Sequence, residues 1–361
     1  MSVSKFECSL MILTIATLLT GCGSSSMPVS TPPPPAPHFA FAANTLSNNL
    51  STFAVDASTG QLTPKNTVPS GGVNPRSIAL APSGHFAYVG NVSSNSISIF
   101  SIDSNTGGVS VVGAPVPTGG GPQTIVVGAG GRVLYVVNQQ DDSITGFSIN
   151  ASTGALTALA GSVPTDDAPV VLRFHPSGTF AYVANFNSGD VTIYRVDNTG
   201  ALGLVGATPV ALSLSAFTIH PSGKFAYAAS VATNQITVLS IDQVSGGLTV
   251  ITPSVNAVDI PSSVTVDAQG RFLYVTNATL NTVSVYAIDA NSGTLTSTSS
   301  APVGTTPIAL AFDTSGRFAY VANLGSDNLS SFTVDPTTGA LTPLGQPVST
   351  GGGPVSVVLT R

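Results

Sequence analysis

The stretch "SGRFAYVANLGSDNLSSFTVDPTTGALT", residues 315–342, recurs along the chain in closely similar form. "SGTFAYVANFNSGDVTIYRVDNTGALG" begins at Ser177, and "SGKFAYAAS" begins at Ser222. Seven copies follow one another at intervals of 45 to 47 residues and together occupy residues 38–361. A repeat of this length indicates a ring or an array of similar structural units. Counted from the residue before each "FAYV"-like motif, the copies begin at His38, His85, Arg132, Thr179, Lys224, Arg271 and Arg317.

Each copy carries four strand signals. "FAYV" at residues 86–89 places two aromatic side chains on one face of a strand, and "SISIFSID" at residues 96–103 alternates polar and apolar residues. A turn such as "SNTGG" then leads to a short "LT"-type strand, and an apolar strand such as "PRSIALAPSG" (residues 75–84) ends the copy. Four strands in each repeat are typical of a propeller blade.

The phase of the repeat predicts how the ring closes. The chain enters at "FAFAAN" (residues 39–44) and ends with "GPVSVVLT" (residues 353–360), which is the strand that precedes "FAYV" in other copies. Pairing the C-terminal strand with the first blade removes two exposed sheet edges. We therefore predict an all-β fold, a closed seven-bladed β-propeller over residues 38–361, in which the "P…PSG" strand is innermost.

The first 37 residues have a different composition. Lys5 precedes the apolar run "LMILTIATLL" (residues 10–19), which is too short to span a membrane, and "LTGC" ends at Cys22. This resembles a bacterial lipoprotein signal. It implies a signal peptide over residues 1–21, a lipid on Cys22, and export to the outer membrane or the cell surface. An ordinary secretory signal is the alternative. Residues 22–37, rich in Pro and Ser, are interpreted as a tether. Cys8 would be removed with the signal peptide, which leaves Cys22 as the one cysteine, so no internal disulfide is expected.

Composition narrows the class of partner. Only 7% of the residues are charged, with 10 Lys and Arg against 16 Asp and Glu, and no basic cluster is present. Nucleic acid is therefore excluded as an expected partner. A surface of Ser, Thr, Asn and Gly suits a neutral polar ligand, a glycan or a protein, although it also suits a merely soluble exported protein. We expect a monomer without a cofactor, attached to the membrane only through the N-terminal lipid.

"HPSGTFAYVANFNSGDVTIYRVD" (residues 175–197) and its sister segments resemble the YVTN-type propeller repeat. They are most similar to the lactonase propellers, the 6-phosphogluconolactonase and cycloisomerase-like group. The resemblance implies a central pocket in which active members present an Arg and a His from "GPRH" at the start of an inner strand, and a Glu after the "FAYV" strand. Arg76 stands at the arginine place, but Ser77 stands at the histidine place. Glu7, inside the predicted signal, is the only glutamate of the chain.

The starts of the inner strands supply the candidate site. Hydrolysis of a lactone requires a general base in addition to hydrogen-bond donors for the oxyanion. None of the residues of this candidate site is a competent base near neutral pH. Two hypotheses follow: a binding scaffold without catalysis, or a lactonase with a site rebuilt from arginines, Gln123 and a histidine. The ligand-binding candidates at the channel mouth are Arg76, Ser77, Gln123, Thr124, Arg173 and Ser262.

Other polar motifs are interpreted as turns. His175 and His220 precede "PSG" in adjacent blades, where later blades have Asp267 and Asp313. Such a set invites a metal hypothesis, but side chains at this place commonly accept hydrogen bonds from turn amides, so we predict no metal site. "DASTG"-type strings lack the further carboxylates of a calcium loop and are predicted to be hairpin turns. The acidic pairs Asp141-Asp142 and Asp166-Asp167 are predicted to be loop residues.

Overall fold

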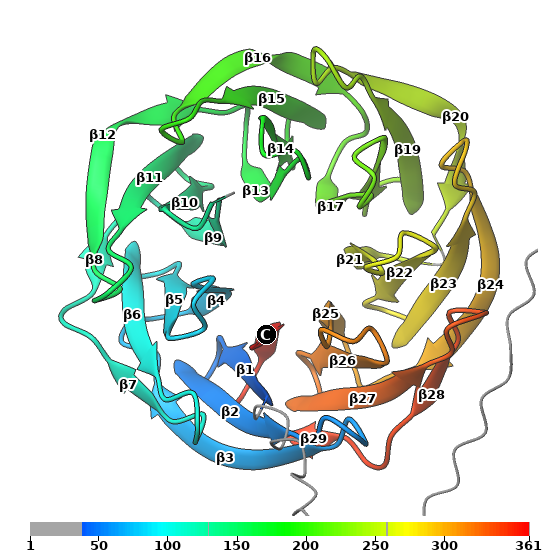
Figure 1. Ribbon diagram of the computed structural model, residues 1–361. Coiled ribbons are helices and arrows are strands. Elements are labelled where there is room, and N and C mark those ends of the chain that lie inside the picture. Colours follow the sequence, from blue (N-terminus) through cyan, green and yellow to red (C-terminus); the bar gives the residue numbers. More distant parts are fainter. Residues whose placement is uncertain (1–37, 129, 258, 361) are drawn as a thin grey trace, which may run out of the picture. The chain divides into compact units, whose positions relative to one another are not determined.

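Short antiparallel strands joined by tight turns make up the part of the chain that the structure describes (Figure 1). This computed structural model describes residues 38–360 except residues 129 and 258. The predicted signal peptide (1–21), the lipidated Cys22 and the tether (22–37) lie outside the described residues. No helix of the described segments is long and apolar enough to cross a membrane.

The strands form seven sheets, which are the predicted blades. Blade 1 contains β1 (His38–Asn44), β2 (Asn49–Val55), β3 (Leu62–Pro69) and β30 (Pro354–Leu359). Blade 2 contains β4 (Pro75–Leu80), β5 (Phe86–Asn91), β6 (Ser96–Ile102), β7 (Val109–Val111) and β8 (Val116–Pro117). Blade 3 contains β9 (Pro122–Val127), β10 (Val133–Asn138), β11 (Ser143–Ile149) and β12 (Leu156–Pro164). Blade 4 contains β13 (Pro169–Phe174), β14 (Phe180–Asn185), β15 (Asp190–Val196) and β16 (Leu202–Pro209).

The remaining blades follow the same order. Blade 5 contains β17 (Leu214–Ile219), β18 (Phe225–Ser230), β19 (Gln235–Ile241) and β20 (Leu248–Asn256). Blade 6 contains β21 (Pro261–Val266), β22 (Phe272–Asn277), β23 (Thr282–Ile288) and β24 (Leu295–Pro302). Blade 7 contains β25 (Pro307–Phe312), β26 (Phe318–Asn323), β27 (Asn328–Val334), β28 (Leu341–Pro343) and β29 (Val348–Ser349).

Blade 1 closes the ring as predicted. Strand β30, from the C-terminal end of the chain, pairs with β1 in antiparallel register, with Ala42 opposite Val357. Figure 1 shows β30 beside β1, between the last blade and the second. The two strands complete a four-stranded sheet in the order β3-β2-β1-β30. The first and last segments of the repeat array are therefore held together by backbone hydrogen bonds as well as by packing.

The core lies between neighbouring blades, because each blade buries one face against the preceding blade and the other face against the following blade. Strand β14 is buried at every position, whereas β12 on the outer rim is mostly exposed. One hydrophobic cluster joins each pair of neighbours; Tyr182 of blade 4, for example, packs with Phe217 and Leu239 of blade 5. The cluster containing Phe53, Tyr320 and Val357 joins blade 7 to blade 1. The alternating apolar pattern of each repeat thus produces seven similar interfaces.

The tyrosine of the "FAYV" motif hydrogen-bonds to the next blade. The Tyr320 hydroxyl donates to the Gly60 carbonyl oxygen at 2.8 Å, across the closure. Gly60 lies in the β2–β3 turn with a φ of 73°, and a Cβ there would collide with the Phe318 ring. The repeated Phe, Tyr and Gly are therefore parts of one interface between blades. The other bonds join Tyr88 to Gly154, Tyr135 to Gly200, Tyr182 to Gly246, Tyr227 to Gly293 and Tyr274 to Gly339.

The turns that follow the second strand of each blade are capped by their first residue. The Asp56 Oδ1 atom accepts hydrogen bonds from the Ser58 hydroxyl at 2.6 Å and from the amides of Ser58 and Thr59 at 2.8 and 2.9 Å. These bonds favour the charged carboxylate and lower the pKa of Asp56 to about 2. Asn150 makes the corresponding amide bonds in blade 3. The prediction that "DASTG"-type strings are hairpin turns is confirmed.

Candidate functional site

The inner strands surround a cavity of about 510 Å³ at the end of the channel where these strands begin. Every residue predicted for the channel mouth lines this cavity. These residues come from four different blades. Figure 1 shows the inner strands grouped around the centre of the ring. The predicted residues among the lining are Arg76 and Ser77 of β4, Gln123 and Thr124 of β9, Arg173 of β13 and Ser262 of β21.

The hydroxyl groups of the lining hold neighbouring inner strands together. The Thr124 hydroxyl donates to the Val170 carbonyl oxygen at 2.7 Å, and the Ser262 hydroxyl donates to the Pro307 carbonyl oxygen at 2.6 Å. The Ser77 hydroxyl accepts a hydrogen bond from the Ile125 amide at 3.2 Å. Each bond runs from one blade to the next, so these side chains have a structural role in addition to any contact with a ligand.

Sequence reasoning missed Ser215 on β17. Its hydroxyl lines the same cavity and donates to the Pro261 carbonyl oxygen at 2.6 Å, as Ser262 does one blade later. The inner strand of blade 5 begins with Leu214 instead of proline, so the "P" that marks the other inner strands is missing. The spacing of the repeat would have located the strand, because Leu214 follows Pro169 by one repeat length.

Gln123 and Gln139 form the amide part of the site. The Gln123 Nε2 atom donates to the Gln139 Oε1 atom at 2.6 Å. Gln139 directly follows Asn138, the last residue of β10, and so stands where active lactonase propellers are expected to carry a glutamate. Phe186, Val231 and Ala278 occupy the same place in the next three blades and also line the cavity. The place is therefore part of the site, but uncharged side chains fill it.

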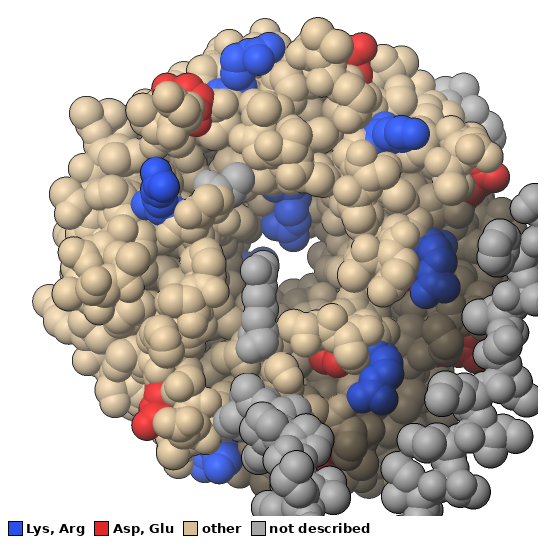
Figure 2. All heavy atoms as spheres, in the orientation of Figure 1, with Lys and Arg blue, Asp and Glu red and all other residues tan. Residues whose placement is uncertain are grey.

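Two arginines bring the only formal charge to the described lining of this cavity. Arg76 is exposed at the mouth, and Arg173 is half-buried, with its Nη1 atom donating to the Leu172 carbonyl oxygen at 3.1 Å. Burial lowers the pKa of Arg173, but a guanidinium remains protonated near neutral pH. Figure 2 shows Lys and Arg atoms on the wall of the central opening. Among the described residues, the one ion pair is Arg271–Asp267 at 3.7 Å, so neither channel arginine has a carboxylate partner there.

The cavity offers hydrogen-bond donors without a general base. Its described lining contains arginine, glutamine, serine and threonine together with apolar side chains, and it contains no aspartate, glutamate or histidine. Guanidinium and amide groups can hold a carbonyl or carboxylate oxygen. Removal of a proton from water requires a group of another kind. The chemistry of the site is thus suited to holding an oxygen-rich ligand.

The histidines and aspartates before the "PSG" turns lie at the opposite ends of the inner strands. The His175 Nδ1 atom bonds to the Ser177 hydroxyl at 2.7 Å, and the His175 Nε2 atom bonds to the Gly223 carbonyl oxygen of the next blade at 3.0 Å. Asp267 accepts bonds from the amides of Arg271 and Phe272 at 2.6 and 2.9 Å. Their predicted role in turns is confirmed. Within the described residues, no group of three or more metal-ligating side chains is present.

The acidic pairs are loop residues, as predicted. Asp141 accepts a bond from the Gly120 amide at 2.6 Å, and Asp142 accepts one from the Ala168 amide at 2.8 Å. Asp167 accepts a bond from the Asn187 side chain at 3.1 Å. Desolvation and the nearby Asp190 raise the pKa of Asp166. These carboxylates therefore fix the loops that connect neighbouring blades.

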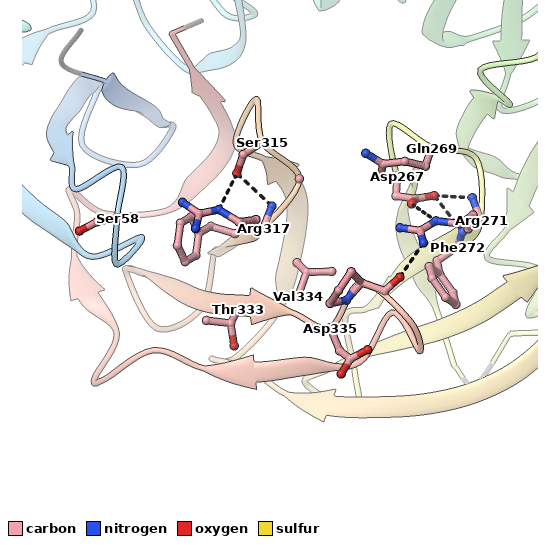
Figure 3. Close-up of a pocket in the computed structure, with 13 residues that line it drawn as sticks. Ser58, Asp267, Gln269, Arg271, Phe272, Ser315, Arg317, Thr333, Val334 and Asp335 are labelled. Atoms are coloured by element: carbon pink, nitrogen blue, oxygen red, sulfur yellow. Dashed lines mark hydrogen bonds and ion pairs between the residues drawn. The ribbon is translucent and has the colours of Figure 1, made fainter. Parts of the chain in front are cut away.

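A second pocket, of about 380 Å³, lies between blades 6 and 7 at the end where the inner strands finish (Figure 3). The Arg271 Nη1 atom donates to the Pro336 carbonyl oxygen at 2.6 Å, and the Arg317 Nη2 atom donates to the Ala57 carbonyl oxygen at 2.7 Å. Each guanidinium also lies over the phenylalanine that follows it. Figure 3 shows the two arginines on opposite sides of the pocket. Both are bonded to the next blade, so this pocket is a seam between blades.

Seven sheets arranged in a ring, with the C-terminal strand β30 completing the first of them, define a seven-bladed β-propeller with a central channel site. The family model "Lactonase, 7-bladed beta-propeller" matches residues 34–122, 116–210, 206–304 and 251–359. The chain belongs to this family, which confirms the resemblance of the repeats. No curated protein matches the chain in sequence at a significant level.

Several solved structures share the fold. A protein from Bacteroides uniformis described as a candidate 6-phosphogluconolactonase has a TM-score of 0.80 at 19% identity, over 90% of this chain and 100% of that one. A protein from Lactobacillus plantarum has a TM-score of 0.79 at 22% identity, over 90% and 100% of the two chains. The periplasmic gluconolactonase PpgL of Pseudomonas aeruginosa has a TM-score of 0.78 at 21% identity, over 90% and 99%.

Proposed function

We propose that this protein is a non-catalytic binding protein of the lactonase propeller family whose ligand occupies the channel cavity. The observation that carries the proposal is the described lining, which combines two guanidinium groups, amides and hydroxyls with no carboxylate or imidazole. Donors of this kind bind an oxygen-rich ligand, but hydrolysis of a lactone also needs a base that activates water.

A lactonase is the second candidate. Family membership and the likeness to a periplasmic gluconolactonase favour it. In such an enzyme Arg76 and Arg173 would stabilise the oxyanion that forms when water attacks the lactone carbonyl. The attacking water would have to lose its proton to solvent or to a neutral side chain, because Gln139 and Phe186 stand where a glutamate is expected. This is why binding without turnover is the preferred function.

The N-terminal motif supports a proposal about where in the cell the protein acts. The "LTGC" segment ending at Cys22 supports the proposal that the protein is exported and attached to the cell envelope by a lipid. The channel would then meet ligands outside the cytoplasm. Movement of a Cys22→Ser variant from the membrane fraction to the soluble fraction supports the proposal, and unchanged partitioning contradicts it.

Proton release in weak buffer tests the choice between binding and hydrolysis. We expect wild-type protein to hydrolyse glucono-δ-lactone and 6-phosphogluconolactone at the uncatalysed rate, since the loss of a general base alone costs about 10²–10⁴-fold. Arg76→Ala should leave this rate unchanged, as should the control Arg195→Ala on the exposed face of β15. Turnover that Arg76→Ala abolishes and Arg195→Ala preserves would establish the lactonase instead.

A further inference from the structure

The channel has a further cavity where the inner strands end, lined by apolar side chains together with backbone polar groups of glycine-containing turns. It is called the apolar cavity here for its side chains. This cavity measures about 720 Å³, and its described lining carries no charged side chain. It is formed by one side of the ring, from blades 1 to 4, whose inner strands are neighbours. The large side chains of this lining are Leu80 of β4, Val127 of β9, Phe174 of β13, and Val358 and Leu359 of β30.

The side chains change from polar to apolar along two of these strands, β4 and β9. Arg76 and Leu80 lie four residues apart on β4, and Gln123 and Val127 lie four residues apart on β9. The first residue of each pair lines the polar cavity and the second lines the apolar cavity. Because a strand advances about 3.3 Å per residue, the polar and apolar parts lie roughly 13 Å apart. The same strands line both cavities, so a ligand with two unlike ends would lie along the strands.

Arg173 stands at the boundary between the two parts. It lines the polar cavity, while the next residue, Phe174, lines the apolar one. Its recorded hydrogen bond goes to the Leu172 carbonyl oxygen, and the described linings of both cavities lack carboxylates. A guanidinium without a carboxylate partner binds an anion well, and an apolar cavity beside it favours an aliphatic group.

We propose that the channel binds a medium-chain carboxylate, with the carboxylate on Arg173 and the aliphatic tail against Leu80, Val127 and Phe174. This rests on the proposed function, because it names the ligand class of the same channel. It replaces the neutral polar ligand expected from composition with an anionic amphiphile. Arg76, at the outer mouth, adds positive charge on the path by which the ligand enters.

Calorimetric titration with butanoate, hexanoate, octanoate and decanoate tests whether the apolar cavity binds the aliphatic tail. The affinity should rise about threefold to fourfold with each added methylene group that the channel buries. Affinity that does not change with chain length would overturn the proposal. Gluconate, which has a carboxylate and no aliphatic tail, should bind more weakly than octanoate.

The variant Arg173→Thr tests whether Arg173 binds the carboxylate of the ligand. Thr218 and Thr265 occupy the corresponding places on β17 and β21, so the fold already accommodates threonine there. The variant should bind octanoate about 10- to 100-fold more weakly and bind neutral octanol as wild type does. Arg195→Thr, which removes an exposed arginine outside the channel, is the matched control and should change neither affinity.

The outcomes separate this inference from the proposed function. If Arg173→Thr binds octanoate as tightly as wild type, the assignment of the carboxylate to Arg173 is wrong. If gluconate binds in an Arg76- and Arg173-dependent way and octanoate does not bind, the channel function stands and the amphiphile is wrong. If no carboxylate, lactone or sugar binds to the channel, both proposals fail.

Discussion

Phe41 and Tyr320 occupy corresponding places in blades 1 and 7 and differ by one hydroxyl group. The Tyr320 hydroxyl bonds to Gly60 across the ring closure, and five other tyrosines make the same bond between their own neighbours. Phe41 cannot donate, so the interface between blades 1 and 2 lacks this hydrogen bond. The seven interfaces are alike in packing, which makes this pair of residues a direct probe of what the bond contributes.

Phe41→Tyr should stabilise the protein. The added hydroxyl would reach the carbonyl oxygen of Gly107, the turn glycine that already packs on Phe39, and a new intramolecular hydrogen bond contributes about 0.5–1.5 kcal/mol. Tyr320→Phe should destabilise by about 1–3 kcal/mol, because it leaves a buried carbonyl oxygen without its donor. Urea unfolding midpoints measure both effects. Shifts of the same sign in the two variants would contradict this account of the interface.

At this scale the sequence predicts less than the structure shows. It places the aromatic residues of "FAYV" on one strand face, but the partner of each tyrosine lies in the following repeat, and sequence periodicity does not identify contacts between repeats. The same limit applies to Thr124 and Ser262. Their hydroxyls were predicted as ligand contacts, and the structure shows them bonded to Val170 and Pro307 of the next blade. Ligand binding by these residues stays a prediction.

At the scale of the element, the capped turns carry all the aspartates of the described residues whose pKa values are lowered. Asp56, Asp242 and Asp335 each accept hydrogen bonds from turn amides, which lowers their pKa. A carboxylate whose pKa is lower in the folded state contributes stability above its unfolded pKa of 3.8, and this is lost as the pH falls toward about 2. The turns should therefore make the propeller sensitive to acid.

Replacement of the capping aspartates by asparagine tests this. Asn150 makes the same amide bonds in blade 3 without a charge, so the turn itself should persist. We expect the melting temperature of wild type to fall as the pH is lowered from about 4 to about 2. A variant with Asp56→Asn, Asp242→Asn and Asp335→Asn should melt like wild type at neutral pH, and its melting temperature should fall less on acidification. Equal acid sensitivity in both proteins would show that the turns are not responsible.

The strands were predicted well wherever the repeat is regular. The outer strands are the exception, because most are longer than the "LT" signal suggests, and β12 extends over Leu156–Pro164. In blades 2 and 7 the outer strand is divided, into β7 and β8 and into β28 and β29. Pro115 and Pro347 fall in these gaps, and proline removes a donor from the sheet ladder. Pro64 lies inside the undivided β3, however, so proline position alone would not have predicted the division.

At the scale of the whole molecule, the phase of the repeats predicted the closed ring and its seam. The first described strand, β1, is a middle strand of blade 1, and the last, β30, is the inner strand that completes this blade. The channel site was predicted in part. Five residues near the starts of the inner strands share one cavity with Arg173, which lies near the end of β13, but the apolar cavity at the other ends was not foreseen. Its large side chains, such as Leu80 and Phe174, also pack against the clusters between blades, so the sequence pattern does not tell them from the core.

The central claim is that the channel holds a ligand without reacting with it. The most direct measurement is a crystal structure of the protein grown with γ-decalactone, a lactone with an aliphatic tail that is stable in water. The account predicts density for the closed lactone ring inside the channel, with its carbonyl oxygen near Arg76 or Arg173 and its tail toward Phe174. Density for the opened hydroxy acid, together with ring opening in solution that is faster with the protein than in buffer alone, would identify a lactonase. A ligand bound only outside the channel, or none at all, would contradict the channel as the functional site.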